Sequence, residues 1–186
     1  MKTVTVKITG KSPLSFGKYV QEPKLEKESH ADYDLRTWRE RMHYDALSGE
    51  VFVPPMMFKN ALSEAAKYRS EQIQGKGKST YTKHFEAGVM VTEPMLLGIN
   101  KDDVQVESLP VPSDGRRGGT TRVVKNFPKI DTWSGTVNFL ILDEIITKDV
   151  FERHLKDAGD FIGVGRFRPR NNGYYGRFTA EITDWK

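Results

Sequence analysis

The residues best suited to chemistry lie in one stretch, GVGRFRPRNNGYYGRF (163–178), which has four glycines, four arginines, four aromatic residues and no acidic residue. Glycine lets the backbone approach a ligand closely and expose its N–H groups. Arginine holds phosphate through paired hydrogen bonds, and exposed rings stack on unpaired bases. Duplex DNA keeps its bases stacked and away from such rings. The stretch therefore predicts a binding site for single-stranded nucleic acid.

Each residue type in this stretch has an expected role. The arginines expected to contact phosphate are Arg166, Arg168, Arg170 and Arg177. The rings expected to stack on bases are Phe167, Tyr174 and Tyr175. Phe178 is instead expected to pack in the core, and Trp133, just before a predicted strand, either stacks on a base or lies at the rim of the core.

Two further segments, residues 67–83 and 116–129, are also basic. Together with residues 163–178 they have a net charge of +13, so the rest of the chain has −9, because the whole chain has +4. Such segregation predicts a basic face for a polyanionic partner, and solvated loops rich in Lys, Arg and Gly are the alternative. The residues expected to extend the binding track are Arg116, Arg117, Arg122 and Lys125, with Lys76 and Lys78 clamping the strand from a mobile loop.

Enzyme chemistry finds less support in the sequence. The chain has no cysteine, and its four histidines do not have a metal-binding spacing. GKGKST (75–80) lacks the spacing of a nucleotide-binding P-loop and follows a predicted helix rather than a strand. We therefore expect no cofactor, no metal and no catalytic residue. A metal-independent ribonuclease that uses His43 or His84 remains an alternative, because it needs little more than a histidine beside the scissile phosphate.

The composition predicts one folded domain over residues 1–186. Hydrophobic residues make up 37% of the chain and charged residues 29%, which is enough apolar surface for a core. The first ten residues lack the apolar run of a signal peptide, and no segment has the ~18 to 20 apolar residues of a membrane span. We expect a cytoplasmic protein without membrane partners.

Hydrophobic periodicity predicts the elements that must position the candidate residues. Strands are predicted over residues 3–8, 87–99 (interrupted near Pro94), 103–111, 136–142 and 177–183. Helices are predicted over residues 55–70, with Pro55 in the first turn, over 147–158, with Thr147 as cap and Gly159 at the end, and over 35–44, with Leu35, Trp38 and Met42 on one side. This order predicts an α+β fold: a ferredoxin-like or RRM-like βαββαβ core with an antiparallel sheet and two helices. Basic insertions are expected near 14–46, 71–86 and 112–130.

Three motifs resemble the RAMP superfamily (repeat-associated mysterious proteins). VTVKITGKSPLSFGK (4–18) is similar to its first strand followed by Ser-Pro-Leu and a glycine. VFVPPMMFKNALSEAAKYRS (51–70) is similar to its proline-led segment before the first helix, although the family's Gly-Ser turn and Lys-Gly-Ala are replaced. GDFIGVGRFRPRNNGYYGRF (159–178) resembles its C-terminal glycine-rich loop. The three motifs frame nearly the whole chain in the family's order.

Within that superfamily, the size and the segment FPKIDTWSGTVNFLILDE (127–144) are most similar to stand-alone, phage-encoded relatives of the CRISPR backbone subunit that coats guide RNA. The resemblance implies an RRM-like core that binds single-stranded nucleic acid, often by self-association along the strand. Because the long insertions of many backbone subunits are missing, it favours DNA over RNA and a role in phage replication or recombination. A guide-RNA-binding subunit and a protein-interaction module that interferes with CRISPR assembly are the alternatives.

Overall fold

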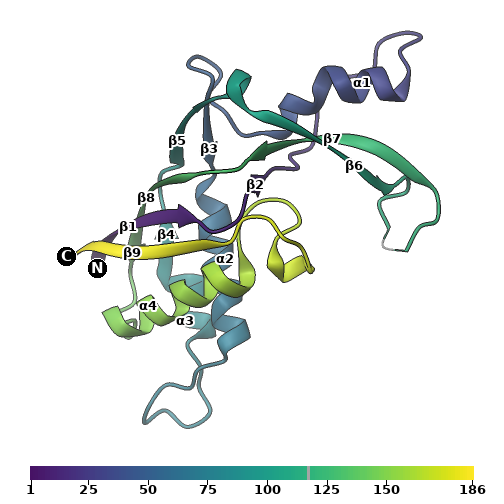
Figure 1. Ribbon diagram of the computed structural model, residues 1–186. Helices are drawn as coiled ribbons and strands as arrows, with labels where there is room; N and C mark the ends of the chain where they lie inside the picture. Colours follow the sequence, from purple (N-terminus) through teal and green to yellow (C-terminus); the bar gives the residue numbers. More distant parts are fainter. Residues whose placement is uncertain (117) are drawn as a thin grey trace.

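The computed structural model describes residues 1–116 and 118–186, and its centre is a four-stranded antiparallel sheet (Figure 1). The strands have the order β4-β8-β1-β9. Their bounds are β1 (Lys2–Gly10), β4 (Val89–Val91), β8 (Ser134–Ile141) and β9 (Phe178–Trp185). The central strand β1 pairs with β8 on one side and with β9 on the other. Its alternating Val4, Val6 and Ile8 are fully buried, so one face of the sheet forms the core.

Two helices, α2 (Pro55–Arg69) and α4 (Lys148–Asp157), cover that face (Figure 1). The α2 helix lies between β1 and β4 in the chain, and α4 lies between β8 and β9. In each case a further strand separates the two strands in the sheet. This is the split βαβ arrangement of a ferredoxin-like domain. The strand order thus confirms the predicted fold class and the core that the RAMP resemblance implies.

The starts of both helices were predicted correctly from single residues in the sequence. Pro55 occupies the first turn of α2, and the Thr147 side chain accepts a hydrogen bond from the backbone N–H of Val150 at the start of α4. The helix predicted over 147–158 is confirmed by α4, but Gly159 does not terminate the helical chain, which continues into a π-helix, η3 (Ala158–Ile162). Gly159 has a packing role instead: a Cβ there would lie 2.2 Å from the carbonyl oxygen of Phe178.

The predicted strand over residues 87–99 is divided between two sheets. A short helix that was not predicted, α3 (Thr82–Gly88), leads into β4, and Pro94 separates β4 from β5 (Met95–Asn100). The β5 strand pairs with β3 (Glu50–Val53) in a separate two-stranded sheet. A proline breaks the ladder at this point because it has no N–H to donate.

A third sheet carries a long hairpin. Its strands are β2 (Leu14–Ser15), β6 (Gln105–Pro112) and β7 (Arg122–Ile130), in the order β2-β7-β6. A 3-10 turn, η2 (Lys101–Asp103), precedes β6. The β6 strand confirms the strand predicted over 103–111, but β7 was expected to be part of an irregular insertion. Its first three residues are all exposed, so no alternation marks it as a strand.

The N-terminal arm, residues 16–49, contains α1 (His30–Thr37) and a 3-10 turn, η1 (Trp38–Arg41). The helix predicted over 35–44 is therefore misplaced. Ser29 starts α1 earlier, because its side chain accepts a hydrogen bond from the N–H of Asp32. Trp38 and Met42 are buried as expected, whereas Leu35 is exposed.

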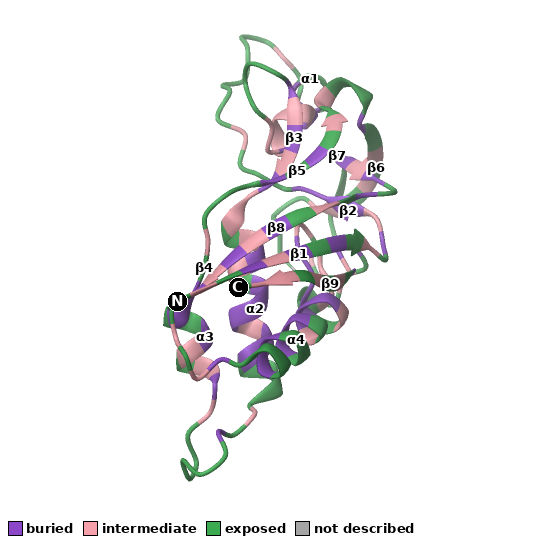
Figure 2. Ribbon diagram, turned by 90° about the vertical axis from the view of Figure 1, so that its left-hand side faces the viewer, coloured by how far each residue is buried: buried purple, intermediate pink, exposed green. Residues whose placement is uncertain are grey.

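The views in Figures 1 and 2 agree on the long axis of the molecule. The arm and the hairpin lie at one end, the four-stranded sheet with its helices lies in the middle, and the loop after α2 extends from the opposite end. Figure 2 shows the buried residues between the sheet and the helices and exposed residues at both ends. No helix in residues 1–116 and 118–186 is long and apolar enough to cross a membrane.

Candidate functional site

The glycine-rich loop, residues 163–178, is packed against the segment that follows β1. Gly165 has a φ of +81°, and a Cβ there would lie 2.5 Å from the carbonyl oxygen of Ser15. The next residue, Arg166, donates its backbone N–H to the same carbonyl at 2.7 Å. Gly176 donates its N–H to the carbonyl of Pro13 at 2.8 Å. These bonds fix the loop against the segment that follows β1.

Three of the four arginines predicted to contact phosphate are bound by acceptors of the protein itself. Arg168 Nη2 lies 2.7 Å from Glu64 Oε1 on α2, and Arg170 Nε lies 3.5 Å from the other oxygen of that carboxylate. Arg177 donates from Nε to the carbonyl of Asp160 at 3.1 Å. The side chain of Arg170 is 60% exposed, against 19% for Arg168. Arg170 is thus the more accessible of the two to a phosphate in solvent.

The fourth arginine, Arg166, packs against the hairpin. Its guanidinium carbon lies 3.4 Å from the centroid of the Phe127 ring on β7. Burial lowers the pKa of Arg166, which remains a cation because its normal pKa is so high. Its Nη1 is buried and has no hydrogen-bond partner among the described residues. Arg166 therefore joins the glycine-rich loop to β7 through a cation–π contact.

The aromatic residues of the loop divide into two that are exposed and one that is not. Phe167 is 47% exposed and Tyr174 is 60% exposed, whereas Tyr175 is 8% exposed. The Tyr175 hydroxyl donates to the carboxylate of Glu107 on β6, and burial together with that carboxylate raises its pKa to about 12. A buried ring cannot stack on a base, so the role predicted for Tyr175 does not fit. Its ring instead supports Tyr174 edge-on, with the two centroids 5.8 Å apart.

Phe167 is held in an unfavourable backbone conformation. Its φ is +47°, a left-handed value that costs a bulky side chain on the order of 1–3 kcal/mol. Gly173 packs on its carbonyl so closely that a Cβ there would lie 1.7 Å from the oxygen. The surrounding loop therefore forces Phe167 into this conformation with its ring half exposed. Such strain is concentrated at functional sites.

The base of the hairpin is fixed by the arm as well as by the glycine-rich loop. Arg41 Nη2 lies 2.7 Å from Asp34 Oδ1, with side-chain exposures of only 11% and 7%. The second oxygen of Asp34 accepts the backbone N–H of Asn126 on β7 at 2.7 Å, and Arg41 donates to the Asn126 carbonyl at 2.6 Å. The arm and the loop thus hold the same part of β7 from two sides.

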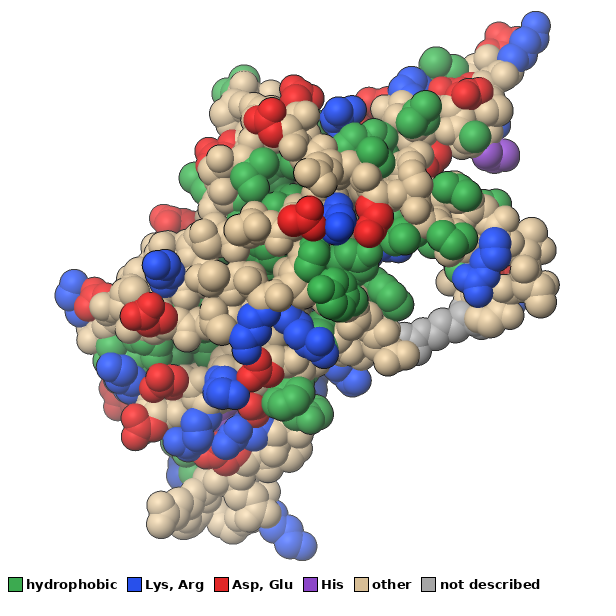
Figure 3. Space-filling view, in the orientation of Figure 1, with side chains coloured by type: hydrophobic (Ala, Val, Ile, Leu, Met, Phe, Trp, Pro, Cys, Tyr) green, Lys and Arg blue, Asp and Glu red, His purple; other side chains and the backbone are tan. Residues whose placement is uncertain are grey.

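Beyond this base the two strands of the hairpin continue away from the four-stranded sheet (Figure 1). Figure 3 shows an open space between the hairpin and the body, with hydrophobic side chains gathered beside it. Arg116 and Arg122 are exposed and Lys125 is half-buried on this projection. Arg117, the remaining basic residue predicted here, lies outside the described residues. These basic side chains therefore lie on the part of the hairpin beyond the base that the arm and the glycine-rich loop hold.

The third basic segment is the loop between α2 and α3, residues 70–81. Lys76 and Lys78 are exposed at its tip, and Ile73 is buried at its base. Glu71 holds the base by ion pairs of 2.6 Å with both Arg69 and Arg153. This loop and the hairpin lie at opposite ends of the molecule (Figures 1 and 2), so the predicted single basic face is instead a row of separate basic segments.

An exposed aromatic pair that was not predicted from the sequence lies on the helix side. Tyr68 near the end of α2 and Phe161 in η3 have ring centroids 5.1 Å apart and planes 30° apart. Tyr68 is 60% exposed and Phe161 46% exposed. No local signal in the sequence places Tyr68 beside the glycine-rich loop, because only the fold brings Glu64, four residues earlier on α2, to Arg168 of that loop.

Two aromatic residues belong to the core. Trp133 is 2% exposed and donates from its indole N–H to the carbonyl of Ser12 at 2.8 Å, so the core alternative is correct. Phe178 is also 2% exposed, as expected. In residues 1–116 and 118–186, no group of three or more His, Asp or Glu side chains is placed to hold a metal ion.

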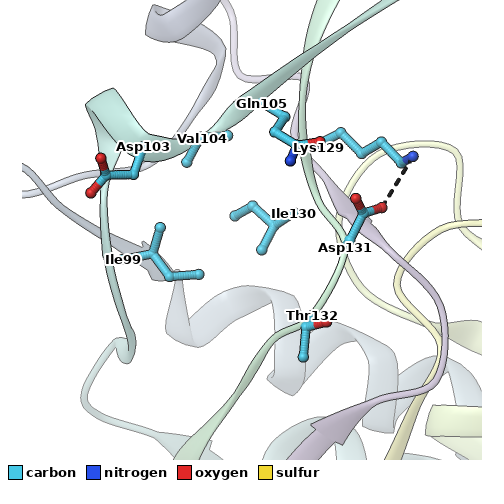
Figure 4. Close-up of a pocket in the computed structure, with 8 residues that line it drawn as sticks. All are labelled: Ile99, Asp103, Val104, Gln105, Lys129, Ile130, Asp131 and Thr132. Atoms are coloured by element: carbon cyan, nitrogen blue, oxygen red, sulfur yellow. Dashed lines mark ion pairs between the residues drawn. The ribbon is translucent and has the colours of Figure 1, made fainter.

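A shallow pocket of about 200 Å³ lies where β5, β6 and β7 meet (Figure 4). Ile99, Val104 and Ile130 contribute its apolar surface. Figure 4 shows Asp103 on one side and the Lys129–Asp131 ion pair, 3.1 Å long, on the other. Because its one cation is already paired and a second carboxylate faces it, this pocket is poorly suited to phosphate.

Comparisons with known proteins give similarity only at the level of structure. No protein-family model and no curated protein matches the chain. The crystal structure of Cmr6 from Pyrococcus furiosus is similar with a TM-score of 0.49 and 14% identity, over 97% of this chain and 98% of that one. A chain of a CRISPR RNA-guided surveillance complex is similar with a TM-score of 0.42 and 8% identity, over 96% of this chain and 68% of that one. Both TM-scores are below 0.5, so the assignment of the fold rests on the strand order.

Proposed function

We propose that this protein binds single-stranded nucleic acid, with the glycine-rich loop as the primary contact. The observation that carries the proposal is the pair of exposed rings, Phe167 and Tyr174, on a loop that is fixed by backbone hydrogen bonds. Rings held in this way can stack on unpaired bases without losing much conformational freedom. Arg170 beside them can hold a phosphate of the same strand.

Charge supports the same proposal. Arg116, Arg122 and Lys125 on the hairpin, and Lys76 and Lys78 on the opposite loop, can attract the backbone of a strand bound at the glycine-rich loop. Contacts of this kind do not read the base sequence, so we expect binding to be sequence-nonspecific. Arg117 retains the phosphate role predicted from the sequence.

Single-stranded DNA is the first candidate ligand. The resemblance to stand-alone phage relatives favours DNA in replication or recombination, with several copies of the chain coating the strand. Phosphate and stacking contacts are common to DNA and RNA, and only a contact to the 2′-hydroxyl separates them. The ratio of the two affinities therefore decides between replication and a guide-RNA assembly.

Fluorescence anisotropy tests the proposal with three labelled probes of ~30 nucleotides: single-stranded DNA, single-stranded RNA and duplex DNA. We expect tight binding to a single strand, weaker binding to duplex, and a slope of log K against log salt of about −0.7 per phosphate neutralised. Equal affinity at low and high salt would contradict the proposed contacts. No binding to any probe would leave a protein-interaction module as the better explanation.

A metal-independent ribonuclease is the second candidate, and one contact favours it. His84 Nδ1 lies 2.6 Å from Asp143 Oδ2, and both side chains are about one-third exposed. A carboxylate in this position orients an imidazole that acts as general base. His43 is less suitable, because it is half-buried and burial and Lys18 lower its pKa.

A gel of the recovered probes separates these two functions. Intact RNA and DNA after incubation support a binding protein without catalytic activity. Shortened RNA that stays intact with the variant His84→Ala would assign the activity to His84. Shortened RNA with that variant as well would exclude His84 as the catalytic residue.

A further inference from the structure

We propose that the bound strand continues from the glycine-rich loop across the helix side of the molecule, where Tyr68 and Phe161 form a second stacking site for its bases. The inference rests on the proposed single-strand binding and extends it to residues outside the three basic segments. The two rings already contact one another at 5.1 Å, and each leaves about half of its surface exposed. Exposed rings are suitable platforms for unpaired bases of any sequence.

The position of Tyr68 along α2 supports this path. Glu64, which holds Arg168 and Arg170 of the glycine-rich loop, lies four residues before Tyr68 and therefore on the same side of the helix. Ser70 ends α2 and begins the loop that carries Lys76 and Lys78. At 1.5 Å per residue, Glu64 and Ser70 are about 9 Å apart along the helix. Tyr68 thus lies between two basic segments that the proposed strand must connect.

The charged residues near the aromatic pair also suit a polyanion. Three exposed cations lie on the elements around it: Lys67 on α2, 58% exposed, Lys156 on α4, 75% exposed, and Arg170 in the glycine-rich loop, 60% exposed. Each is paired with a carboxylate at the surface, and surface ion pairs of this kind are weak enough for a phosphate to replace. A protein partner would need a larger apolar surface than two rings provide, so we assign the pair to nucleic acid.

The test compares a ~6-nucleotide probe, which reaches only the glycine-rich loop, with a ~20-nucleotide probe, which reaches both sites. We expect Tyr68→Leu and Phe161→Leu each to weaken binding of the long single-stranded DNA probe at least about fivefold and to leave the short probe unaffected. The matched control is Met90→Ala, an exposed apolar residue on β4 that lies away from the proposed path. Circular dichroism and thermal unfolding verify that each variant is folded.

A second measurement reports the contact directly. In the variant Tyr68→Trp, the emission of the new indole is expected to be quenched by the long probe and unchanged by the short one. Unchanged emission together with unchanged long-probe affinity in the leucine variants would overturn the second site. Equal losses on both probes would also overturn it, because they would place the pair in the primary site. If the wild-type protein binds neither probe, the proposed function fails first and the second site fails with it.

Discussion

The glycine-rich loop (163–178) and the tip of the hairpin (112–122) have similar compositions but differ in how closely the rest of the protein packs against them. Both are rich in glycine and arginine. In the loop, a Cβ added at Gly165 would collide with the carbonyl of Ser15, whereas a Cβ added at Gly115 in the tip would meet no atom within 4 Å among the described residues beyond its chain neighbours. Similar residues can therefore build a fixed surface or a free projection. We expect the loop to hold aromatic rings in position for base stacking and the hairpin to contribute positive charge that attracts phosphate.

The largest effect on stability is expected at the base of the hairpin, where the arm contributes the buried ion pair between Arg41 and Asp34. In Asp34→Ala, Arg41 keeps its buried guanidinium without a carboxylate, and we expect the free energy of unfolding to fall by about 3 kcal/mol or more. Urea unfolding measures this loss. The matched control is Asp184→Ala, which removes an exposed ion pair with Lys186 and should cost less than about 1 kcal/mol. Equal losses in both variants would mean that the arm does not hold the hairpin.

The next effect compares two glycines that both have positive φ. Gly165 has a φ of +81° and Gly115 a φ of +70°. Gly115→Ala adds only the left-handed backbone penalty of about 1 kcal/mol. Gly165→Ala adds the collision with Ser15 to the same penalty, so we expect a loss of about 2–3 kcal/mol and weaker binding of single strands. Thermal unfolding of the two variants side by side tests the difference, and identical melting temperatures would contradict the packed loop.

Two substitutions with smaller expected effects distinguish the contribution of base stacking to binding from that of phosphate contacts. Phe167→Leu removes a stacking ring, so we expect affinity for single strands to fall by about 1–3 kcal/mol while the salt slope stays the same. Arg122→Gln removes one phosphate contact on the hairpin, so we expect a smaller loss of affinity and a salt slope that is shallower by about 0.7. Titrations at several salt concentrations measure both quantities. A change of slope in Phe167→Leu would contradict the division of roles.

The fold was largely predictable because its signals are local. Alternation in β1, β8 and β9, the proline at the start of α2 and the threonine cap of α4 each depend on a few neighbouring residues. The misses have non-local causes. The role of Gly159 depends on the carbonyl of Phe178 in β9, which leaves no room for a Cβ at position 159, and β7 is a strand because β6 pairs with it.

The candidate site was predictable in composition but not in geometry. The sequence shows that residues 163–178 contain arginines and rings, and it does not show which of them are already bound. Glu64 is about one hundred positions from Arg168, and Glu107 is 68 positions from Tyr175. Only the folded chain brings these carboxylates to the loop. The same reason explains why Tyr68 and Phe161 were missed, since each ring is exposed beside a partner from another helix.

The smallest effect concerns the loop at the opposite end, which is free at its tip and held at its base by Glu71. Hydrogen bonds from Arg153 and Arg69 lower the pKa of Glu71 from 4.5 to about 2. A carboxyl group whose pKa is lower in the folded state stabilises the fold above pH ~4.5, and this contribution is lost as the pH falls towards 2. Because solvent reaches these side chains, we expect no more than about 1 kcal/mol. Urea unfolding between pH 7 and pH 3 should show this loss in the wild type and in the exposed control Glu93→Gln, and less of it in Glu71→Gln. An identical pH dependence in all three would show that the ion pairs at Glu71 do not hold the base of this loop.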